Sequence, residues 1–325
     1  MPEIKLNNVL DANKFLQGKI ERTPLLTFDS LSEFIGFDVY FKAELFQKTG
    51  SFKIRGILNK LRSLNVVQKK TGVVAMSAGD HAVSLAIITS RLRIPCVVIL
   101  PTGAVKSKMS IIKKTGARII IRKNNLWDAC IKMQEKYGLT VIHPFDDPLV
   151  IAGQGTIGLE ILNDLPNVDM IFIPVGGGGL ISGISLAVKS INPKVKVIGV
   201  EPENAPTLYL SIHHDNLIKL RNCKTIADGL AARYVGKNTL SISKKYVDNV
   251  VLVSDKEIIK SMKMILKYGK ILTEPSAAAA FAAVLFKKVL IKPGSKIACL
   301  ISGVNQNEDE ILKMLNYYKK NDRKK

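Results

Sequence analysis

VDMIFIPVGGGGLISGISLAV, residues Val168–Val188, is the stretch that decides the fold. It opens with an almost unbroken apolar run, Met170–Val175, which is typical of a strand buried on both faces. Four consecutive glycines follow, and from Leu180 to Ser190 the spacing of the apolar residues is compatible with a helix. A strand, a glycine loop and a helix in this order predict a cradle for an anion.

The glycine loop can bind an anion for two physical reasons. Glycines lack a Cβ, so successive backbone N–H groups can turn toward one oxyanion, and a helix that begins near Leu180 adds the positive end of its dipole. A tight turn that only lets helix and strand pack closely is the alternative. Ile181 stands where the dinucleotide fingerprint requires glycine, and no Gly-Lys-Ser/Thr follows as in nucleoside-triphosphate loops. We therefore expect a phosphate of another ligand class.

The composition is that of a folded protein with room for two domains or lobes. The chain has 325 residues, of which 47% are hydrophobic. The N-terminal residues mix charged and apolar side chains, and no run of about 18 uncharged apolar residues occurs. We expect a soluble, cytoplasmic protein. The four cysteines show no CxxC spacing and are expected to be buried thiols: Cys96, Cys130, Cys223 and Cys299.

The formal net charge of +21 raises the question of a nucleic-acid partner. The basic residues are spread over many segments, and only Lys319–Lys325 forms a compact run. Aromatic residues amount to 6% and are not interleaved with the basic ones. We expect a solvated basic surface with neither a specific nucleic-acid partner nor a membrane partner, while non-specific association at low salt stays open.

Strands and helices are predicted to alternate from Thr71 to His143, which indicates an open α/β unit with a parallel sheet. The predicted strands are Val73–Ser77, Cys96–Pro101, Arg118–Arg122 and Thr140–His143, and the predicted helices are His81–Arg91, Val105–Thr115 and Leu126–Tyr137. A second α/β series begins at the glycine loop. It includes strands Val195–Glu201 and Lys296–Ile301, helices Lys256–Tyr268 and Ser276–Leu290, and short strands and loops over Lys219–Asp255.

Ser77-Ala78-Gly79-Asp80-His81 follows the first strand of the first series. Ligands gather beyond the carboxyl ends of strands in such sheets. Small residues and free N–H groups there suit a carboxylate, and a helix cap by Asp80 is an equally good alternative.

KTGSFKIRG, residues 48–56, places Lys53 in the first turn of a helix that we expect to be capped by Ser51 and to run to Leu64. The positive field of a helix N-terminus disfavours an ammonium group, and a lowered pKa suits an amine that forms a Schiff base. Lys53 is also one of 48 lysines and arginines, and its spacing alone favours a surface lysine.

Taken together, these segments resemble the fold-type II pyridoxal-phosphate enzymes, in particular the threonine dehydratase and serine racemase group. The resemblance extends from Thr23 to Asn305. The segments that carry it are, in order, KTGSFKIRG, SAGDHA, GQGT at Gly153–Thr156, PVGGGG, TIADGLA at Thr225–Ala231, EPSAAA at Glu274–Ala279 and SGVN. It implies a tryptophan synthase β-like fold of two open, mainly parallel α/β domains with the site between them. A large domain would comprise residues 1–66 and 148–325, and a small domain residues 67–147.

The resemblance also implies pyridoxal 5'-phosphate as the cofactor and Lys53 as its Schiff-base lysine and catalytic residue. The implied cofactor-binding residues are Phe52, Asp80, Gly176, Gly177, Gly178, Gly179, Leu180 and Ser302. The implied substrate-binding residues are Ser77, Ala78, Gly79 and His81. A neutral serine at Ser302, unlike an aspartate, does not keep the ring nitrogen protonated, which suits β-elimination rather than transamination.

The implied reaction converts L-threonine, and secondarily L-serine, to a 2-oxo acid and ammonia, with Lys53 accepting the Cα proton. Serine racemases have a serine where this chain has Ala78, and the region around Trp127 also resembles the dehydratases. A serine racemase or hydroxyaspartate dehydratase is the alternative, and a catalytically impaired cofactor-binding or nucleic-acid-associating protein is the second alternative. The group implies a homodimer or homotetramer, and the short stretch after Asn305 leads us to expect no appended regulatory domain.

Three positions depart from the pattern of the group. Asp80 replaces an asparagine, and because an ionised carboxylate would repel the substrate carboxylate, we hypothesise that Asp80 is held protonated. Val304 replaces a glycine and is expected to crowd the edge of the ring. Glu201 and Ala205 match the group's divalent-cation site, but Thr207 replaces its aspartate, which makes a bound metal doubtful.

Overall fold

The computed structural model describes residues 3–322, and its larger sheet has six strands in the order β1-β2-β10-β7-β8-β9. These strands are β1 (Leu25–Thr27), β2 (Asp38–Ala43), β7 (Met170–Pro174), β8 (Lys196–Pro202), β9 (Asn249–Val253) and β10 (Lys296–Ile301). Neighbouring strands are parallel except for the antiparallel pair β1 and β2. The predicted mainly parallel α/β class is confirmed.

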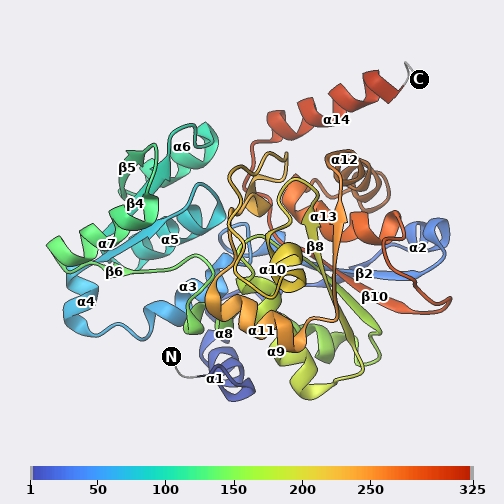
Figure 1. The fold of residues 1–325 in the computed structure, drawn as a ribbon, viewed down its shortest axis with the longest axis horizontal. Coiled ribbons are helices and arrows are strands. Elements are labelled where there is room, and N and C mark those ends of the chain that lie inside the picture. The colour runs from blue at the N-terminus through green and yellow to red at the C-terminus, as the bar shows by residue number, and fades with distance from the viewer. Residues whose placement is uncertain (1–2, 323–325) are drawn as a thin grey trace.

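A second sheet has four strands, all parallel, in the order β5-β4-β3-β6. Its strands are β3 (Val73–Met76), β4 (Cys96–Pro101), β5 (Arg118–Arg122) and β6 (Thr140–Val141). The accompanying helices are α4 (Val66–Thr71), α5 (Asp80–Arg91), α6 (Lys106–Lys114) and α7 (Leu126–Tyr137). Figure 1 shows this sheet and its helices gathered at one end of the molecule, with the larger sheet at the other.

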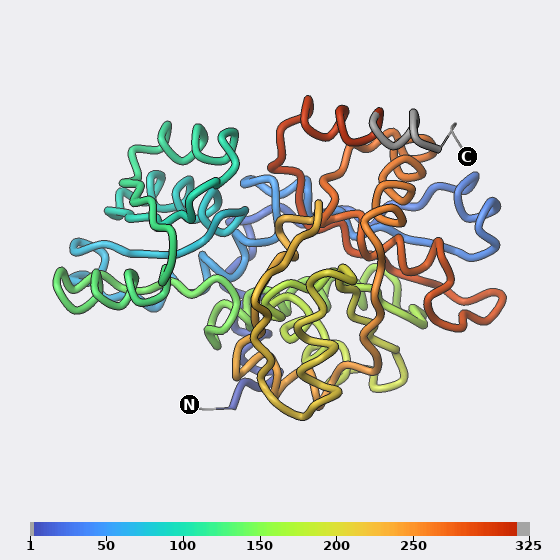
Figure 2. Tube along the Cα trace, turned by 45° about the horizontal axis from the view of Figure 1, so that its top comes forward, coloured from blue at the N-terminus to red at the C-terminus, as the bar shows by residue number. Residues whose placement is uncertain are grey.

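The other helices lie with the larger sheet, although the helix that begins at Lys53 also packs against the core of the smaller sheet through Ile54, Ile57 and Leu61. They are α1 (Leu6–Leu16), α2 (Asp29–Ile35), α3 (Lys53–Leu61), α8 (Pro148–Asp164), α9 (Gly179–Ile191), α10 (Thr207–His213), α11 (Lys237–Tyr246), α12 (Asp255–Met264), α13 (Pro275–Leu285) and α14 (Glu308–Asp322). Shorter pieces are the 3-10 helices η1 (Glu44–Phe46) and η2 (Asp228–Leu230) and the π-helix η3 (Ile265–Gly269). The tube in Figure 2 shows α1 and α14 on different sides of the molecule.

The central strand β7 is buried on both faces, as its apolar run predicts. Phe172 faces a core shared with α12 and α13, whereas Ile171 and Ile173 face a core shared with α8 and α9. Successive side chains of a strand point to opposite faces, so a strand between two helical layers needs apolar residues throughout. The alanine-rich α13 packs against β7, β8 and β10 because its small side chains let the helix approach closely. It ends at Leu285, earlier than the predicted Leu290.

Glycines bring α3 and α8 into direct backbone contact. A Cβ on Gly153 would lie 2.6 Å from the carbonyl oxygen of Arg55, and one on Gly56 would lie 2.7 Å from that of Val150. The GQGT segment therefore has a packing role, which is to seat the helix that begins at Lys53.

Two local predictions were wrong. Ser51 does not cap α3, which begins after Phe52 and ends at Leu61; the Ser51 hydroxyl lies 3.4 Å from that of Ser84. A helix, α11, lies within the region expected to hold only short strands and loops. Its N-terminus is capped from far away in the chain, since the Asp146 carboxylate accepts hydrogen bonds from three backbone N–H groups at 3.0–3.1 Å.

The four cysteines are free thiols. Cys96, Cys130 and Cys299 are buried as predicted, whereas Cys223 is only partly buried. In the part of the chain that the structure describes, no helix is long and apolar enough to cross a membrane. The basic run Lys319–Lys325 extends past the described residues.

Candidate active site

A cavity of about 350 Å³ lies where strands of both sheets end. Its wall includes residues that directly follow β3, β7 and β10, which is where ligands bind in parallel α/β sheets. The cavity brings together all the cofactor- and substrate-binding residues expected from the sequence: Phe52, Lys53, Ser77, Ala78, Gly79, Asp80, His81, Gly176, Gly177, Gly178, Gly179, Leu180 and Ser302. The two residues that match the cation site of the resembled group, Glu201 and Ala205, are not among the described residues of this wall.

Lys53 is the first residue of α3, and its amine donates a hydrogen bond to the carbonyl oxygen of Pro144 at 3.1 Å. Desolvation lowers the pKa of Lys53 to about 8, and the nearby Asp80 carboxylate acts in the opposite direction. A lowered pKa suits a Schiff-base amine, and burial in the wall of the cavity is its largest cause.

A buried charge network fixes the helix that carries Lys53. The Arg55 guanidinium is fully buried and donates two hydrogen bonds to Glu44, at 2.7 and 2.8 Å, and two to Glu160, at 2.6 and 2.9 Å. Lys42 also pairs with Glu160, at 2.6 Å. Because each charge has a partner of opposite sign, the network can be buried, and removing one member would cost about 3–5 kcal/mol. The position of Lys53 is therefore set by β2, η1 and α8 together.

The glycine loop forms the opposite wall. Gly178 has φ +89°, and α9 begins directly after it, at Gly179, with no side-chain cap from the described residues. The first backbone N–H groups of α9 therefore have no side-chain acceptor of their own and are suited to bind an anion. A Cβ on Gly179 would lie 2.6 Å from the carbonyl oxygen of Phe145, so only glycine fits this position without a shift.

Ser302 ends up beside Lys53 because two distant segments are joined by backbone hydrogen bonds. The Phe52 N–H donates to the Ser302 carbonyl at 3.1 Å, and the Asn305 side chain donates to the Thr49 carbonyl at 3.0 Å. Ser302 is 5% exposed. Val304 packs against the core of the larger sheet and is not among the residues of the cavity wall, so the predicted crowding of the site by Val304 was wrong.

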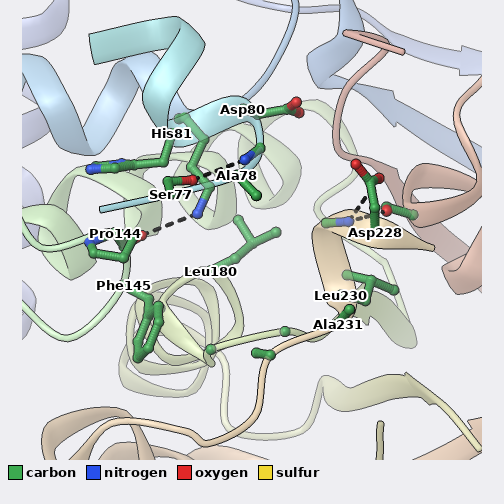
Figure 3. A pocket seen from close by; sticks show the side chains of 18 of the residues that line it. Ser77, Ala78, Asp80, His81, Pro144, Phe145, Leu180, Asp228, Leu230 and Ala231 are labelled. Carbon is green, nitrogen blue, oxygen red and sulfur yellow. Dashed lines mark hydrogen bonds between the residues drawn. The ribbon is translucent and has the colours of Figure 1, made fainter. Parts of the chain in front are cut away.

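The turn Ser77–His81 forms the rim on the side of the smaller sheet. The Gly79 N–H donates to the Ser77 hydroxyl at 3.1 Å, and His81 Nε2 donates to the Ile142 carbonyl at 3.0 Å. Desolvation lowers the pKa of His81 to about 3, so its ring is neutral. Figure 3 shows the side chains of His81 and Asp80 pointing to opposite sides of this turn.

Asp80 belongs to a cluster of charges that was not expected from the sequence. Lys108 Nζ lies 3.3 Å from Asp80 Oδ1 and 2.9 Å from Asp228 Oδ2. Desolvation raises the pKa of Asp80, and the Lys108 ammonium acts against this rise. Although burial alone would lower it, the carboxylates of Asp80, Glu274 and Asp228 raise the pKa of Lys108. As for Asp80, burial raises the pKa of Glu274, here well above its usual range. Asp228 and Glu274 lie in the segments TIADGLA and EPSAAA, which carried the resemblance to the group. No sequence motif pointed to Lys108, which was predicted only to lie in a helix.

A row of aromatic rings closes the cavity on one side. Ring centroids are 5.2 Å apart for Trp127 and His143, 4.6 Å for His143 and Phe145, and 5.9 Å for Phe145 and Tyr234. Phe145 and Tyr234 line the cavity directly. Neither was expected from the sequence, since both lie in connecting segments without a periodic pattern.

The residues that match the cation site of the resembled group, Glu201 and Ala205, do not fit a cation. Glu201 is fully buried, and its carboxylate accepts hydrogen bonds from the Thr207 hydroxyl at 3.2 Å and from the Leu208 and Tyr209 N–H groups at 2.8 Å. The Ala205 carbonyl accepts from the Thr207 N–H at 3.0 Å. Hydrogen-bond donors thus occupy the oxygens that a cation would need. Among the described residues, no group of three or more His, Cys, Asp or Glu side chains is placed to hold a metal.

The family model, the sequence relatives and the solved structure that the chain resembles agree on one class of enzyme. A family model described as "Pyridoxal-phosphate dependent enzyme" matches residues 16–303. The L-threonine ammonia-lyase of Thermotoga maritima is 43% identical over 316 residues, covering 96% of this chain and 78% of that protein. The catabolic L-threonine dehydratase of Escherichia coli K12 is 40% identical over 306 residues, covering 93% of each chain. Among solved structures, maize serine racemase has a TM-score of 0.91 at 33% identity and covers 99% of this chain and 100% of its own.

Proposed function

The chain belongs to the pyridoxal-phosphate dependent enzyme family, and on this premise we propose that it is an ammonia-lyase that converts L-threonine, and L-serine secondarily, to a 2-oxo acid and ammonia. One observation carries the proposal: the Lys53 amine, the glycine loop, Ser302 and the Ser77–His81 turn line a single cavity. Two relatives of 40% identity or more that bear the same activity in their names support the choice of substrate.

The residues of the cavity fit pyridoxal phosphate. A lysine amine with a lowered pKa stands in the wall, and the uncapped start of α9 faces the same space. We assign the phosphate to Gly176–Leu180, the aldehyde to Lys53, one ring face to Phe52 and the ring nitrogen to Ser302. When bound, pyridoxal phosphate supplies an aldehyde that links to amines and a conjugated ring that stabilises negative charge at the substrate Cα.

Lys53 carries the proton transfer. Its Nζ is the group that would hold the cofactor and, as a free amine, would accept the Cα proton of the amino acid. A pKa of about 8 leaves part of this amine neutral, and therefore basic, near neutral pH. Loss of the Cα proton and of the β-hydroxyl gives an enamino acid, which water hydrolyses to the 2-oxo acid and ammonia. The Ser77 and Gly79 N–H groups already donate to Ile99 and Ser77, so the remaining N–H groups of the turn would hold the substrate carboxylate. The neutral His81 ring adds no charge there.

Ala78 argues against the serine racemase alternative. Racemisation needs a group that delivers a proton to the face of the Cα opposite Lys53. Ala78 lines the cavity at the position where serine racemases have a serine, and a methyl group cannot donate a proton. The resemblance to maize serine racemase reflects the shared fold and family, and we expect D-serine formation to be slow.

The charge of the wall argues against a hydroxyaspartate dehydratase. Asp80, Asp228 and Glu274 all line the cavity, together with the basic residues Lys53 and Arg233. A substrate with a second carboxylate would approach three acidic side chains, which is unfavourable. The apolar side chains of Leu126 and Phe145 in the same wall suit the methyl group of threonine better.

Product formation from three substrates tests this assignment. The cofactor-loaded protein is supplied with L-threonine, L-serine or L-threo-3-hydroxyaspartate, and the release of 2-oxo acid is followed. We expect kcat/KM to be highest for L-threonine, intermediate for L-serine and lowest for the dicarboxylate. A dicarboxylate preference, or D-serine formation faster than pyruvate release from L-serine, would replace the proposed substrate or reaction.

We also propose two domains, residues 1–66 with 148–325 and residues 67–147. In support, the strands of the smaller sheet all lie between Val73 and Val141, and those of the larger sheet lie outside this range. Limited proteolysis that releases no fragment near the boundaries 66–67 and 147–148 would count against this division. We further propose that the protein is a homodimer or homotetramer and is located in the cytoplasm. Light scattering coupled to gel filtration would measure the number of subunits.

A further inference from the structure

Lys108 of α6 is a buried charge that the proposed mechanism does not use. It is 1% exposed and is among the largest fully buried side chains, whereas Lys106 and Lys113 of the same helix are exposed. Removing an ammonium group from water is strongly unfavourable unless carboxylates nearby compensate. The burial of Lys108 therefore requires partners that are fixed in space.

Those partners come from two walls of the cavity. Asp80, 3.3 Å from the ammonium, begins α5 beside the smaller sheet, and Asp228, 2.9 Å from it, begins η2 in the other half of the molecule. Figure 3 shows the Asp80 carboxyl pointing away from Ser77, toward the side of the cavity where Asp228 lies. Lys108 thus joins the rim that carries the Ser77–His81 turn to the rim formed by η2.

The two carboxylates depend on Lys108 to different degrees. The side chain of Asp228 is 30% exposed and can be solvated by water, whereas that of Asp80 is 11% exposed. The ammonium also lies 3.9 Å from the point that a Cβ on Gly79 would occupy, so it sits directly against the turn. Asp80 is therefore the group that needs this counter-ion most.

We propose that Lys108 is a positioning residue of the substrate site: as the counter-ion of Asp80 and a bridge to Asp228, it holds the Ser77–Asp80 turn where a substrate carboxylate binds. This inference rests on the proposed function, which places the carboxylate at that turn. Lys108 is absent from the described residues of the cavity wall and acts through Asp80. The proposal requires Asp80 to be ionised and paired, in contrast to the protonated Asp80 hypothesised from the sequence. The pair explains how an aspartate is tolerated where the resembled group has asparagine.

Binding of L-2-aminobutanoate tests the proposal. This probe has the amine and carboxylate of threonine but no β-hydroxyl to lose, and its binding is followed by the visible absorbance of the cofactor. Lys108→Met keeps the length of the side chain and removes its charge, so it should weaken binding by about tenfold or more. Lys113→Met makes the same change at an exposed position of α6 and should stay within about twofold of wild type. Wild-type affinity in Lys108→Met would overturn the proposal.

A double variant separates positioning from a merely structural role. In Lys108→Met combined with Asp80→Asn, no ionised Asp80 is left without its counter-ion, so binding should return to within about threefold of Asp80→Asn alone. A double variant that binds as weakly as Lys108→Met, with the same loss in thermal midpoint, would overturn the proposal. If Lys108→Met does not fold, the affinity of the double variant for the probe, compared with that of Asp80→Asn, still tests the proposal. Tight probe binding without turnover of L-threonine in the wild type would instead refute the proposed substrate and leave this test intact.

Discussion

The two sides of the cavity are built in different ways. On the side of the larger sheet, a backbone hydrogen bond from Phe52 joins the Lys53 segment to Ser302. With the glycine loop, these residues offer N–H donors, one amine and one hydroxyl to the cavity. On the side of the smaller sheet, Asp80 depends on Lys108, which lies in another helix and also pairs with Asp228 across the cavity. Both sides depend on charge pairs between distant segments. On the first side the Arg55 network lies outside the described residues of the cavity wall, whereas on the second side a paired carboxylate, Asp80, belongs to the wall itself.

The two sides of the cavity are suited to different proposed roles, cofactor binding on the first side and substrate binding on the second. A cradle of backbone N–H groups has no alternative charge state, so it suits a ligand that stays bound through many turnovers. A rim held by ion pairs between two halves of the molecule can respond to the charge of each incoming substrate. We expect substitutions on the first side to change cofactor binding and substitutions on the second side to change substrate binding and pH dependence.

Among the variants that compare the two sides of the cavity, Gly179→Ala in the glycine loop should have the largest effect. The added Cβ would meet the backbone carbonyl of Phe145 at 2.6 Å, which requires a backbone shift. Overpacking of this kind costs about 1–3 kcal/mol, and the affinity for pyridoxal phosphate should fall about ten- to a hundredfold. Titration of the apoprotein with the cofactor measures this change, with Ser190→Ala at the exposed end of α9 as the control. Unchanged cofactor affinity would mean that the phosphate binds elsewhere.

Asp80→Asn should have a smaller effect and act through charge. The rate of cofactor uptake by the apoprotein should rise with pH as Lys53, whose pKa desolvation lowers to about 8, loses its proton. Because the Asp80 carboxylate raises the pKa of Lys53, its removal should move the midpoint of this rise to lower pH. Threonine turnover should persist or increase. A midpoint that moves upward would exclude electrostatic coupling between Asp80 and Lys53, and complete loss of turnover would give Asp80 a catalytic role of its own.

The smallest effect concerns acid stability on the side of the smaller sheet. Desolvation lowers the pKa of His81 to about 3 and of His143 to about 4, whereas histidine in an unfolded chain has a pKa of about 6.5. Below about pH 6.5 the unfolded chain therefore binds protons that the folded protein does not. The stability is fully present above that pH and falls on acidification, by about 1.4 kcal/mol per pH unit for each histidine.

His81→Gln should flatten this dependence between about pH 6.5 and 5, where few carboxyl groups titrate. Urea unfolding at several pH values gives the free energy of unfolding that is needed. His213→Gln, at an exposed position, is the matched control and should keep the wild-type slope. An unchanged slope in His81→Gln would show that His81 is not buried in its neutral form in solution.

Much of the fold and of the larger-sheet side of the site could be predicted because the signals are local. The apolar run of β7, the glycines after it and the alanines of α13 each determine the burial of their own element. The residues of the candidate site could be collected from motifs, although their roles remain proposals. What the sequence did not show depends on distant partners. Asp146 caps α11, and Lys108 neutralises Asp80, and neither relation has a periodicity or a fixed spacing.

We propose that Lys53 accepts the Cα proton of threonine in this cavity, so that the β-hydroxyl is lost from the neighbouring carbon. The most direct measurement is the release of 2-oxobutanoate and ammonia from L-threonine by the cofactor-loaded protein, with Lys53→Ala as the comparison. We expect equal amounts of both products from the wild type and a rate lower by about a hundredfold or more in Lys53→Ala, since both the cofactor link and the proton acceptor are lost. Turnover by Lys53→Ala at the wild-type rate, or no product from a wild-type protein that binds the cofactor, would contradict the account.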